Sequence, residues 1–484
     1  MPKIDKPTVR NEISRIKADF EQLCADGKIT GEIKVLMNSM LMIMELMLSI
    51  FLEKTTKKNS KNSSIPSSQT DKDESALTST SGSNGKGKSE NNATVDNTRI
   101  TESVTVSKVN DCEVCGEDLT DITCSEHERR TKIDIVFEKV VEHVDAEVKQ
   151  CPACASTTRA SFPSDLHGPL QYGNGLKAFV INLLVCQMVA LNRVQKLVKS
   201  MMDVTISEAS LLKFVLRLHL ALAQWENSAK EELLKMPAMN VDETSLRVDK
   251  KNHWIHVYSG GDITLKCLER GRGLKAIDSI GIVPRYGGVI IHDCWASYFS
   301  YQHCGHGLCG SHLMRELTFV IESNGYAWAK NMKRLLRETC ASVSGSQQKK
   351  ISDEDYANLQ KRFRNMITRG EKELPPIPPK PSGKRGRIAK SDAHNLWERL
   401  KDNEKAVLLF AKDPHVSFTN NRAERDLRMA KVKQKVSGCF RTVKYAEAYC
   451  RISSYLQTMA NKGVNPLIAI QMAMAGKITG VGGE

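Results

Sequence analysis

Three acidic residues, Asp242, Asp293 and Glu424, are the side chains whose type and setting most directly suggest chemistry. Carboxylates are the hard oxygen ligands that Mg²⁺ takes, and a few suffice because this ion keeps several waters. Two such ions can generate a nucleophile from water or from a 3′-hydroxyl and stabilise the leaving oxygen. If the three side chains converge, they predict a two-metal phosphoryl-transfer site acting on nucleic acid.

Spacing alone does not establish that convergence. The acids are 51 residues apart (293−242) and 131 residues apart (424−293), as unrelated surface residues could also be. Whether they converge depends on the strands and the helix that carry them.

The two aspartates fall on strand patterns. Residues 238–248 read as a strand that carries Asp242, and residues 253–258 and 263–269 follow as strands with hairpin-type connections. The apolar run before Asp293 fits the buried centre of a sheet flanked by helices. Asp293 would lie at that strand's exit, where the ligand groups of open sheets gather. Glu243 should point to the opposite face from Asp242, which makes it a poor co-ligand.

Glu424 falls in a basic helix that Asn420 or Asn421 can cap. An apolar stripe would face the protein, formed by Ala423, Leu427 and Ala430. Another face holds one acid and three cations, Glu424, Arg428, Lys431 and Lys435. Opposite two strand aspartates, Glu424 would become a third ligand, with the cations available to phosphates.

The charge distribution suits a polyanionic partner. The formal net charge is +14, and residues 361–390 carry ten Lys or Arg against two Glu. Residues 411–451 carry ten Lys or Arg against four acids. Such blocks favour nucleic acid, and the alternative is a solvated basic surface.

Four of the fourteen cysteines form two C-x-x-C pairs, Cys112 with Cys115 and Cys151 with Cys154. Two such pairs can place four thiolates around one structural Zn²⁺, which stabilises a small module without a large core. The less favoured alternative is a redox-active pair. Metal-binding cysteines indicate a reducing compartment, and the charged first 30 or so residues do not fit a signal peptide, so a cytoplasmic, nucleoid-associated location is expected.

The length of 484 residues predicts several folded units. Residues 1–53 read as two helical segments broken near Gly27, and residues 54–109 as a Ser-, Asn- and Lys-rich flexible linker. The Met-rich stretch 35–52 approaches the length of a membrane span, but polar interruptions favour a packed or oligomerising helix. Residues 110–155 are the expected zinc module, and residues 446–484 a C-terminal helical segment.

Residues 170–235 are helical by period and contain a helix, short turn, helix pattern. Thr205-x-x-Glu208 predicts a capping box at the start of the second helix. Such a pair could enter a DNA groove, and an ordinary helical hairpin is equally compatible.

At these residues the chain resembles the transposases of the insertion-sequence 66 family, within the DDE superfamily. The similar stretches follow the family's order across most of residues 57–445: KKNSKNSSIPSSQ, the paired C-x-x-C module, NRVQKLVKS with ISEASL, VDET, HDCWASY, CGSHLMRELTFV, KRGRIAKSDAHNLWERL and NNRAERDLRMAKVKQKVSGCFRT. This collinearity is far more specific than any single motif.

The resemblance implies an α/β catalytic core of RNase H-like type over residues 236–445, with a helical insertion at about 310–395. Asp242, Asp293 and Glu424 would hold two Mg²⁺ or Mn²⁺ ions, and the zinc module would correspond to residues 110–155. Several basic residues are expected to contact DNA phosphates, namely Arg422, Arg425, Arg428, Lys431, Lys435 and Arg441.

Neighbouring side chains leave alternatives open. A cluster after Asp293 could be a second zinc site, although a structural or DNA-contacting role is preferred; it comprises His303, Cys304, His306, Cys309 and His312. Trp295 and Tyr298 could stack on a flipped base, but packing is the simpler interpretation.

The function implied is a transposase that binds the terminal inverted repeats of its own element and catalyses metal-dependent cleavage and strand transfer into target DNA. Its expected partners are double-stranded DNA, further copies of the chain and accessory proteins of the same element. The alternative is a zinc-containing DNA-binding regulator whose transposase-derived domain is inactive.

Overall fold

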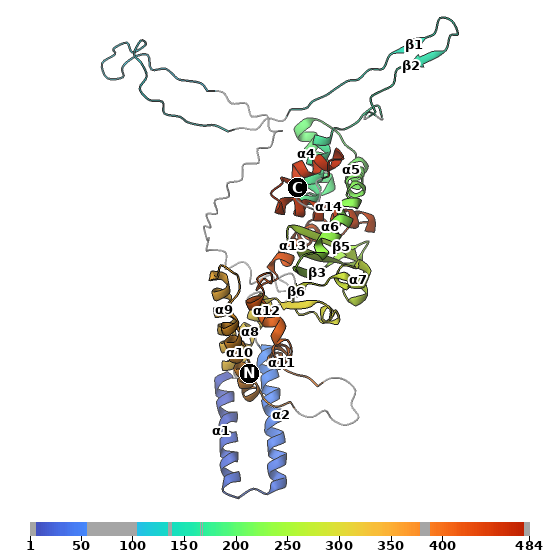
Figure 1. Cartoon of the computed structure of the whole chain (residues 1–484). Helices are drawn as coiled ribbons and strands as arrows, with labels where there is room; N and C mark the ends of the chain where they lie inside the picture. Colours follow the sequence, from blue (N-terminus) through green and yellow to red (C-terminus); the bar gives the residue numbers. More distant parts are fainter. Residues whose placement is uncertain are drawn as a thin grey trace, which may run out of the picture.

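A five-stranded mixed sheet lies at the centre of the chain (Figure 1). The computed structural model describes residues 6–55, 104–133, 138–164, 166, 168–377 and 388–478. The strands lie in the order β5-β4-β3-β6-β7. Their bounds are Ala238–Val248 (β3), Lys251–Gly260 (β4), Ile263–Glu269 (β5), Val289–His292 (β6) and Gly305–Leu308 (β7).

The first three of these strands form an antiparallel meander, as predicted. Asp249 and Lys250 connect β3 to β4 with φ of +47° and +59°. Two-residue hairpin turns of this kind need positive φ at their central positions. Gly261, at φ +51°, begins the next turn. The predicted strands of residues 238–248, 253–258 and 263–269 are therefore confirmed.

β6 and β7 extend the sheet in parallel with β3. β6 is almost entirely apolar and largely buried, as expected for a strand inside a sheet. The connection from β5 to β6 contains the short helix α7 (Leu274–Ile280). β7 has the sequence GHGL, without alternation or β-branched residues, and sequence analysis does not predict it.

Two helices pack on the meander, α13 (Asn421–Ser437) on β3 and β4 and α14 (Val443–Asn461) on β5. The stripe of Ala423, Leu427 and Ala430 is buried, as predicted. One carboxylate fastens α13 to the sheet: Asp426 Oδ2 accepts hydrogen bonds from Ser259 Oγ at 2.7 Å and from Thr264 Oγ1 at 3.0 Å.

Further helices complete the larger hydrophobic core. They are α3 (Asn174–Ile181), α4 (Leu191–Met202), α5 (Glu208–Ala221), α6 (Ala223–Leu234) and α15 (Pro466–Met474). The predicted helix, turn, helix pattern is present as α4 and α5. The predicted capping box is wrong, because α5 begins two residues later: Ser207 is the N-cap, and its Oγ accepts from Ser210 N.

A second hydrophobic core is built from helices that lie between β7 and α13 in sequence. They are α8 (Gly310–Asn324), α9 (Ala327–Gly345), α10 (Asp353–Glu373), α11 (Asp392–Asp402) and α12 (Glu404–Lys412). Trp328 and Phe363 are fully buried at its centre. Gly370 allows α10 to approach α11, because a Cβ there would lie 2.6 Å from Trp397 Cδ1.

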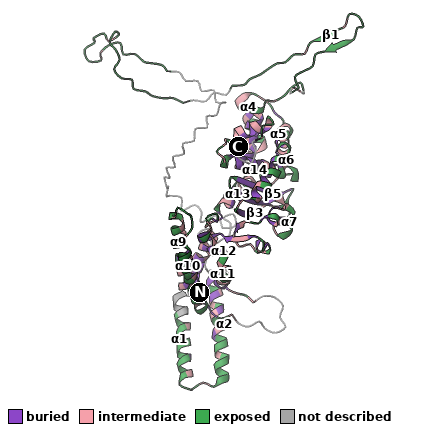
Figure 2. Cartoon of the chain, viewed as in Figure 1, coloured by how far each residue is buried: buried purple, intermediate pink, exposed green. Residues whose placement is uncertain are grey.

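The N-terminal segment is a helical hairpin of α1 (Lys6–Ala25) and α2 (Gly31–Thr55), which projects from the second core (Figure 1). The break falls near Gly27, as predicted. The end of α2 is held by Glu53, whose carboxylate accepts from Asp392 N at 2.5 Å and from Ala393 N at 2.9 Å at the start of α11. Much of the hairpin's remaining surface is exposed (Figure 2).

One helix in the described ranges is long and apolar enough to cross a membrane. It spans Gly31–Lys54, has a mean hydropathy of 2.0 in its most apolar window, and 22% of that window is buried. Helices of this kind also occur in the cores of other proteins, and α2 packs on α8.

The two C-x-x-C pairs lie in separate turns on two arms that diverge in Figure 1. Gly116 N donates to Cys112 O at 2.9 Å, and Ala155 N donates to Cys151 O at 2.8 Å, so the turns are alike. The second turn joins the strands of a small hairpin, β1 (Val148–Gln150) and β2 (Thr157–Arg159). In the described part of the chain the four thiols do not form a group of metal ligands, and a shared zinc remains a prediction.

Candidate active site

Asp242 lies in the middle of β3 and faces the other predicted acids. Its Oδ1 accepts a hydrogen bond from Glu243 N at 2.8 Å. Burial raises the pKa of Asp242 well above its ordinary value, and the negative charges of Glu243, Asp293 and Glu424 raise it further. A carboxyl in this position is costly to ionise without a cation nearby.

Asp293 follows β6 directly, at the strand's exit. The parallel register pairs Asn240 with Ile291, so Asp242 and Asp293 each lie two residues farther along neighbouring strands. Residues two apart share a face of a sheet, so this register would bring the two carboxylates near each other, and the charge of Asp293 accordingly raises the pKa of Asp242. Trp295 N donates to Asp293 Oδ1 at 3.1 Å.

The backbone turns sharply after Asp293. Cys294 has a φ of +73°, a left-handed conformation that is unusual for a residue other than glycine. Such conformations are often found at functional sites, because the surrounding structure must hold them in place.

Glu424 lies in the first turn of α13, and the start of that helix is fixed to the sheet by Asn420. The Asn420 side chain is fully buried: its Oδ1 accepts from Asn240 Nδ2 at 2.9 Å, and its Nδ2 donates to Val241 O at 2.8 Å. Asn420 is the N-cap residue, but its side chain does not cap the helix. It instead connects α13 to β3 beside Asp242.

The structure therefore brings the three acids into one neighbourhood. Glu424 and Asp293 both contribute to the raised pKa of Asp242. All three side chains offer carboxylate oxygens as ligands, which suits Mg²⁺ or Mn²⁺. Mutual repulsion between close carboxylates is what a bound divalent cation would relieve, so these residues fit such an ion.

Glu243 has two side-chain partners of its own, Arg272 and Tyr298. Its Oε1 is 2.5 Å from Arg272 Nε, and its Oε2 accepts from Tyr298 OH at 2.7 Å. Burial and the charge of Asp293 raise the pKa of Glu243, whereas Arg272 opposes the shift. Both oxygens are occupied, so Glu243 is not a free ligand.

Arg272 is the residue near the site that sequence reasoning missed. It contacts Glu243 and lies 3.7 Å, Nη2 to Oδ2, from Asp293. Its guanidinium also stacks 3.7 Å from the Trp295 ring centroid. The loop sequence ERGRGLK carries no spacing signal that distinguishes this arginine from Arg270. Trp295 and Tyr298 are engaged in packing and hydrogen bonding, as the simpler interpretation expects.

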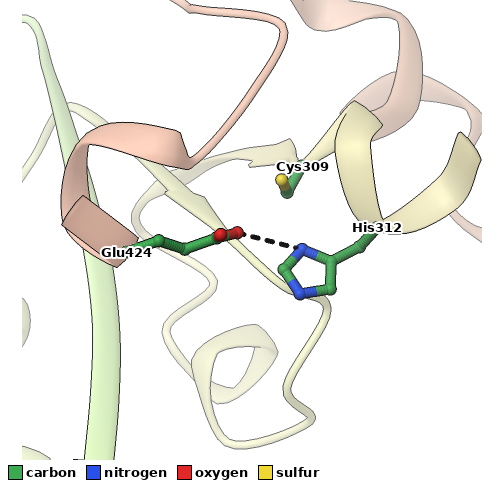
Figure 3. A group of neighbouring side chains, drawn as sticks. All are labelled: Cys309, His312 and Glu424. Carbon is green, nitrogen blue, oxygen red and sulfur yellow. Dashed lines mark ion pairs between the residues drawn. The ribbon is translucent and has the colours of Figure 1, made fainter. Parts of the chain in front are cut away.

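The His and Cys cluster after Asp293 divides into two groups. His303 and Cys304 make polar contacts with backbone oxygens, and His306 lies 3.2 Å from His292, ring nitrogen to ring nitrogen. Cys309 and His312 instead lie beside Glu424 (Figure 3). The five residues do not form one site.

The six candidate DNA contacts differ in exposure. Arg422 donates to Ile263 O at 3.0 Å, and burial lowers its pKa. Lys431 donates to Ser245 O at 2.8 Å and is also partly buried. The other four are exposed along α13 and after it, namely Arg425, Arg428, Lys435 and Arg441.

Comparison with known proteins adds to this geometry. No curated protein matches the chain. The sequence model of the transposase IS66 family matches residues 169–448, more than half of the chain, and this range contains the sheet, the helices of the second core and the three acids. The chain therefore belongs to the IS66 family of transposases.

Proposed function

We propose that this transposase is a DDE-type enzyme whose acids are Asp242, Asp293 and Glu424. The observation that supports the proposal is the parallel register of β3 and β6 together with the effect of the charges of Asp293 and Glu424 on the pKa of Asp242. Three antiparallel strands followed by two parallel ones also fit an RNase H-like core. The helical insertion of about residues 310–395 would then begin with α8 and reach the start of α11.

The three carboxylates would hold two Mg²⁺ or Mn²⁺ ions. Bound divalent ions activate the attacking oxygen and stabilise the leaving oxygen of an in-line displacement. Water would attack the phosphodiester at the element's end, and the freed 3′-hydroxyl would then attack target DNA. Neither step requires a covalent bond to the protein.

The protein's own residues would position these groups. Asn420 fixes the start of α13 to β3, and Asp426 fixes its next turn to β4 and β5. These contacts hold Glu424 over the sheet. Small displacements of catalytic groups lower rates steeply.

DNA would run along the exposed basic side of α13. Arg425, Arg428 and Lys435 are exposed there, and contacts to phosphates give affinity without sequence preference. Recognition of the terminal inverted repeats is assigned to residues 170–235. A zinc-bearing module of residues 110–155 and accessory proteins of the element remain part of the proposal.

The test is a cleavage and joining assay on DNA that carries the ends of the element. We expect Mg²⁺-dependent nicking at the ends and joining of the 3′-end to a second DNA, with binding retained when Mg²⁺ is left out. Binding without nicking under any divalent ion would favour the alternative, a regulator with an inactive domain.

A further inference from the structure

Cys309, His312 and Glu424 form a group of three ligand atoms outside the pair of aspartates. The thiol sulfur, an imidazole nitrogen and a carboxylate oxygen all lie within 4.8 Å of one another (Figure 3). His312 Nδ1 is 3.5 Å from Glu424 Oε1. Ligand atoms around a tetrahedral Zn²⁺ lie roughly 3.5 Å apart, given bond lengths of about 2.0–2.3 Å.

The two facing atoms are buried without hydrogen-bond partners among the described residues. Neither His312 Nδ1 nor Glu424 Oε1 has a hydrogen-bond partner in the described part of the chain. Arg315 Nη2 lies 3.8 Å from Glu424 Oε1, too far for a hydrogen bond. Buried polar atoms without partners are rare in folded proteins and call for an explanation.

The backbone prepares the sulfur as a ligand. Cys309 is the N-cap of α8, so its side chain lies at the positive end of the helix dipole. Asn420 N donates to Cys309 Sγ at 3.1 Å. Burial raises the pKa of Cys309 and the charge of Glu424 adds to the rise, whereas backbone N–H groups of Asn420, His312 and Ser311 oppose it. Such outer hydrogen bonds orient metal ligands and stabilise their charge.

We propose that Cys309, His312 and Glu424 bind one transition-metal ion of the Zn²⁺ class, at a site separate from the one formed by Asp242 and Asp293. Thiolate and imidazole ligands select Zn²⁺ over Mg²⁺. Three protein ligands would leave a fourth position open. Binding would release the thiol proton of Cys309 to solvent.

A metal ion at this site would affect the proposed catalysis, and only this effect rests on the proposed function. Glu424 would be shared between the two metal sites. An ion held by Cys309 and His312 would hold Oε1 of Glu424 toward α8, and so compete with Mg²⁺ for the third carboxylate.

The test is a Co²⁺ titration of the full chain without DNA. Thiolate-bound Co²⁺ gives a sulfur-to-metal charge-transfer absorption, whereas carboxylate sites do not. We expect the Cys309→Ser variant and the His312→Ala variant each to bind one less thiolate-bound Co²⁺ ion per chain than the wild type does. Cys340→Ser and His415→Ala remove the same side chains elsewhere and should match the wild type.

Glu424→Gln is nearly isosteric and serves as the control for misfolding. It should weaken the same absorption and leave the thermal unfolding transition unchanged. Equal Co²⁺ stoichiometry in the wild type and His312→Ala would overturn the proposal. So would displacement of this Co²⁺ by Mg²⁺ at similar concentration. Because no DNA is present, either result leaves the proposed strand cleavage intact.

Discussion

At the scale of single residues, the carboxyl of Asp242 is destabilised as an anion by burial and by its acidic neighbours. An acid with a raised pKa in the folded protein contributes stability that is present below its unfolded pKa and is lost as pH rises through the folded pKa. In the metal-free chain, Asp242 therefore lowers the stability of the fold at pH values above its folded pKa. A divalent cation should reverse the effect.

Because ionised Asp242 destabilises the metal-free fold, removing its charge should stabilise the protein at high pH. Asp242→Asn should raise the melting temperature of the metal-free protein at about pH 8 and change it little at about pH 4, because the neutral amide has no charge to bury. Added Mg²⁺ should stabilise the wild type more at the higher pH and the variant hardly at all. Thermal unfolding with and without Mg²⁺ measures both, and a less stable variant at about pH 8 would contradict the account.

Arg272 lies between Glu243 and Asp293 and contacts both carboxylates. Arg272→Met should destabilise the fold by about 3 kcal/mol, because it leaves Glu243 buried without its cation. The double variant Arg272→Met with Glu243→Gln should recover part of that loss. Urea unfolding measures each free energy, and equal stability of the two variants would show that the pair does not interact.

At the scale of elements, the position of Glu424 depends on how α13 joins the sheet. The sequence predicts the helix and its buried stripe, because both follow from a short periodic pattern. It does not predict that Asn420 bonds to Asn240 and Val241, since residues 180 positions apart meet only in the fold. For the same reason it predicts Asn420 at the N-cap position, where the structure has it, but not that its side chain bonds to the sheet and leaves the helix uncapped.

Asn420→Ala tests this junction. It should destabilise the protein by roughly 1–3 kcal/mol, because Asn240 and Val241 lose buried hydrogen bonds, and it should lower end cleavage by misplacing Glu424. Asn421→Ala is the matched control, since Asn421 is exposed at the next position. Equal unfolding free energies in the two variants would remove this role from Asn420.

The pairing of Asp242 with Asp293 shows how far local patterns reach. Each strand is predictable from its own residues, and their hairpins from the turns between them. The parallel pairing of β3 with β6 is not, because it depends on packing between distant segments. Arg272 escaped prediction because its partners come from two separate stretches of chain, β3 and the turn after β6.

At the scale of the whole molecule, the N-terminal hairpin extends from the second core with large apolar side chains exposed. Val35, Leu36, Met40 and Met47 are all more than half exposed. Exposed apolar patches of this kind mark interaction surfaces. The end of α2 is docked through Glu53, so the hairpin is fixed to the rest of the chain.

We predict that copies of the chain associate through the exposed apolar surface of the N-terminal hairpin. The wild type should sediment as an oligomer, and Leu36→Lys with Met40→Lys should shift it toward the monomer. Leu220→Lys, at another exposed leucine, is the control and should not. A wild type that is monomeric at all concentrations, or that partitions into lipid vesicles through residues 35–52, would contradict this interpretation.

The central claim is that Asp242, Asp293 and Glu424 act together on DNA, and one measurement tests it most directly. End cleavage in Mg²⁺ should be compared for Asp242→Asn, Asp293→Asn and Glu424→Gln, with the exposed Glu447→Gln as control. We expect each of the three variants to cleave more than about 100-fold more slowly than the wild type, since loss of a residue that only supports a metal ligand can already cost that much. Binding to the element ends should be unchanged. Cleavage at the wild-type rate by any of them would contradict the account for that residue.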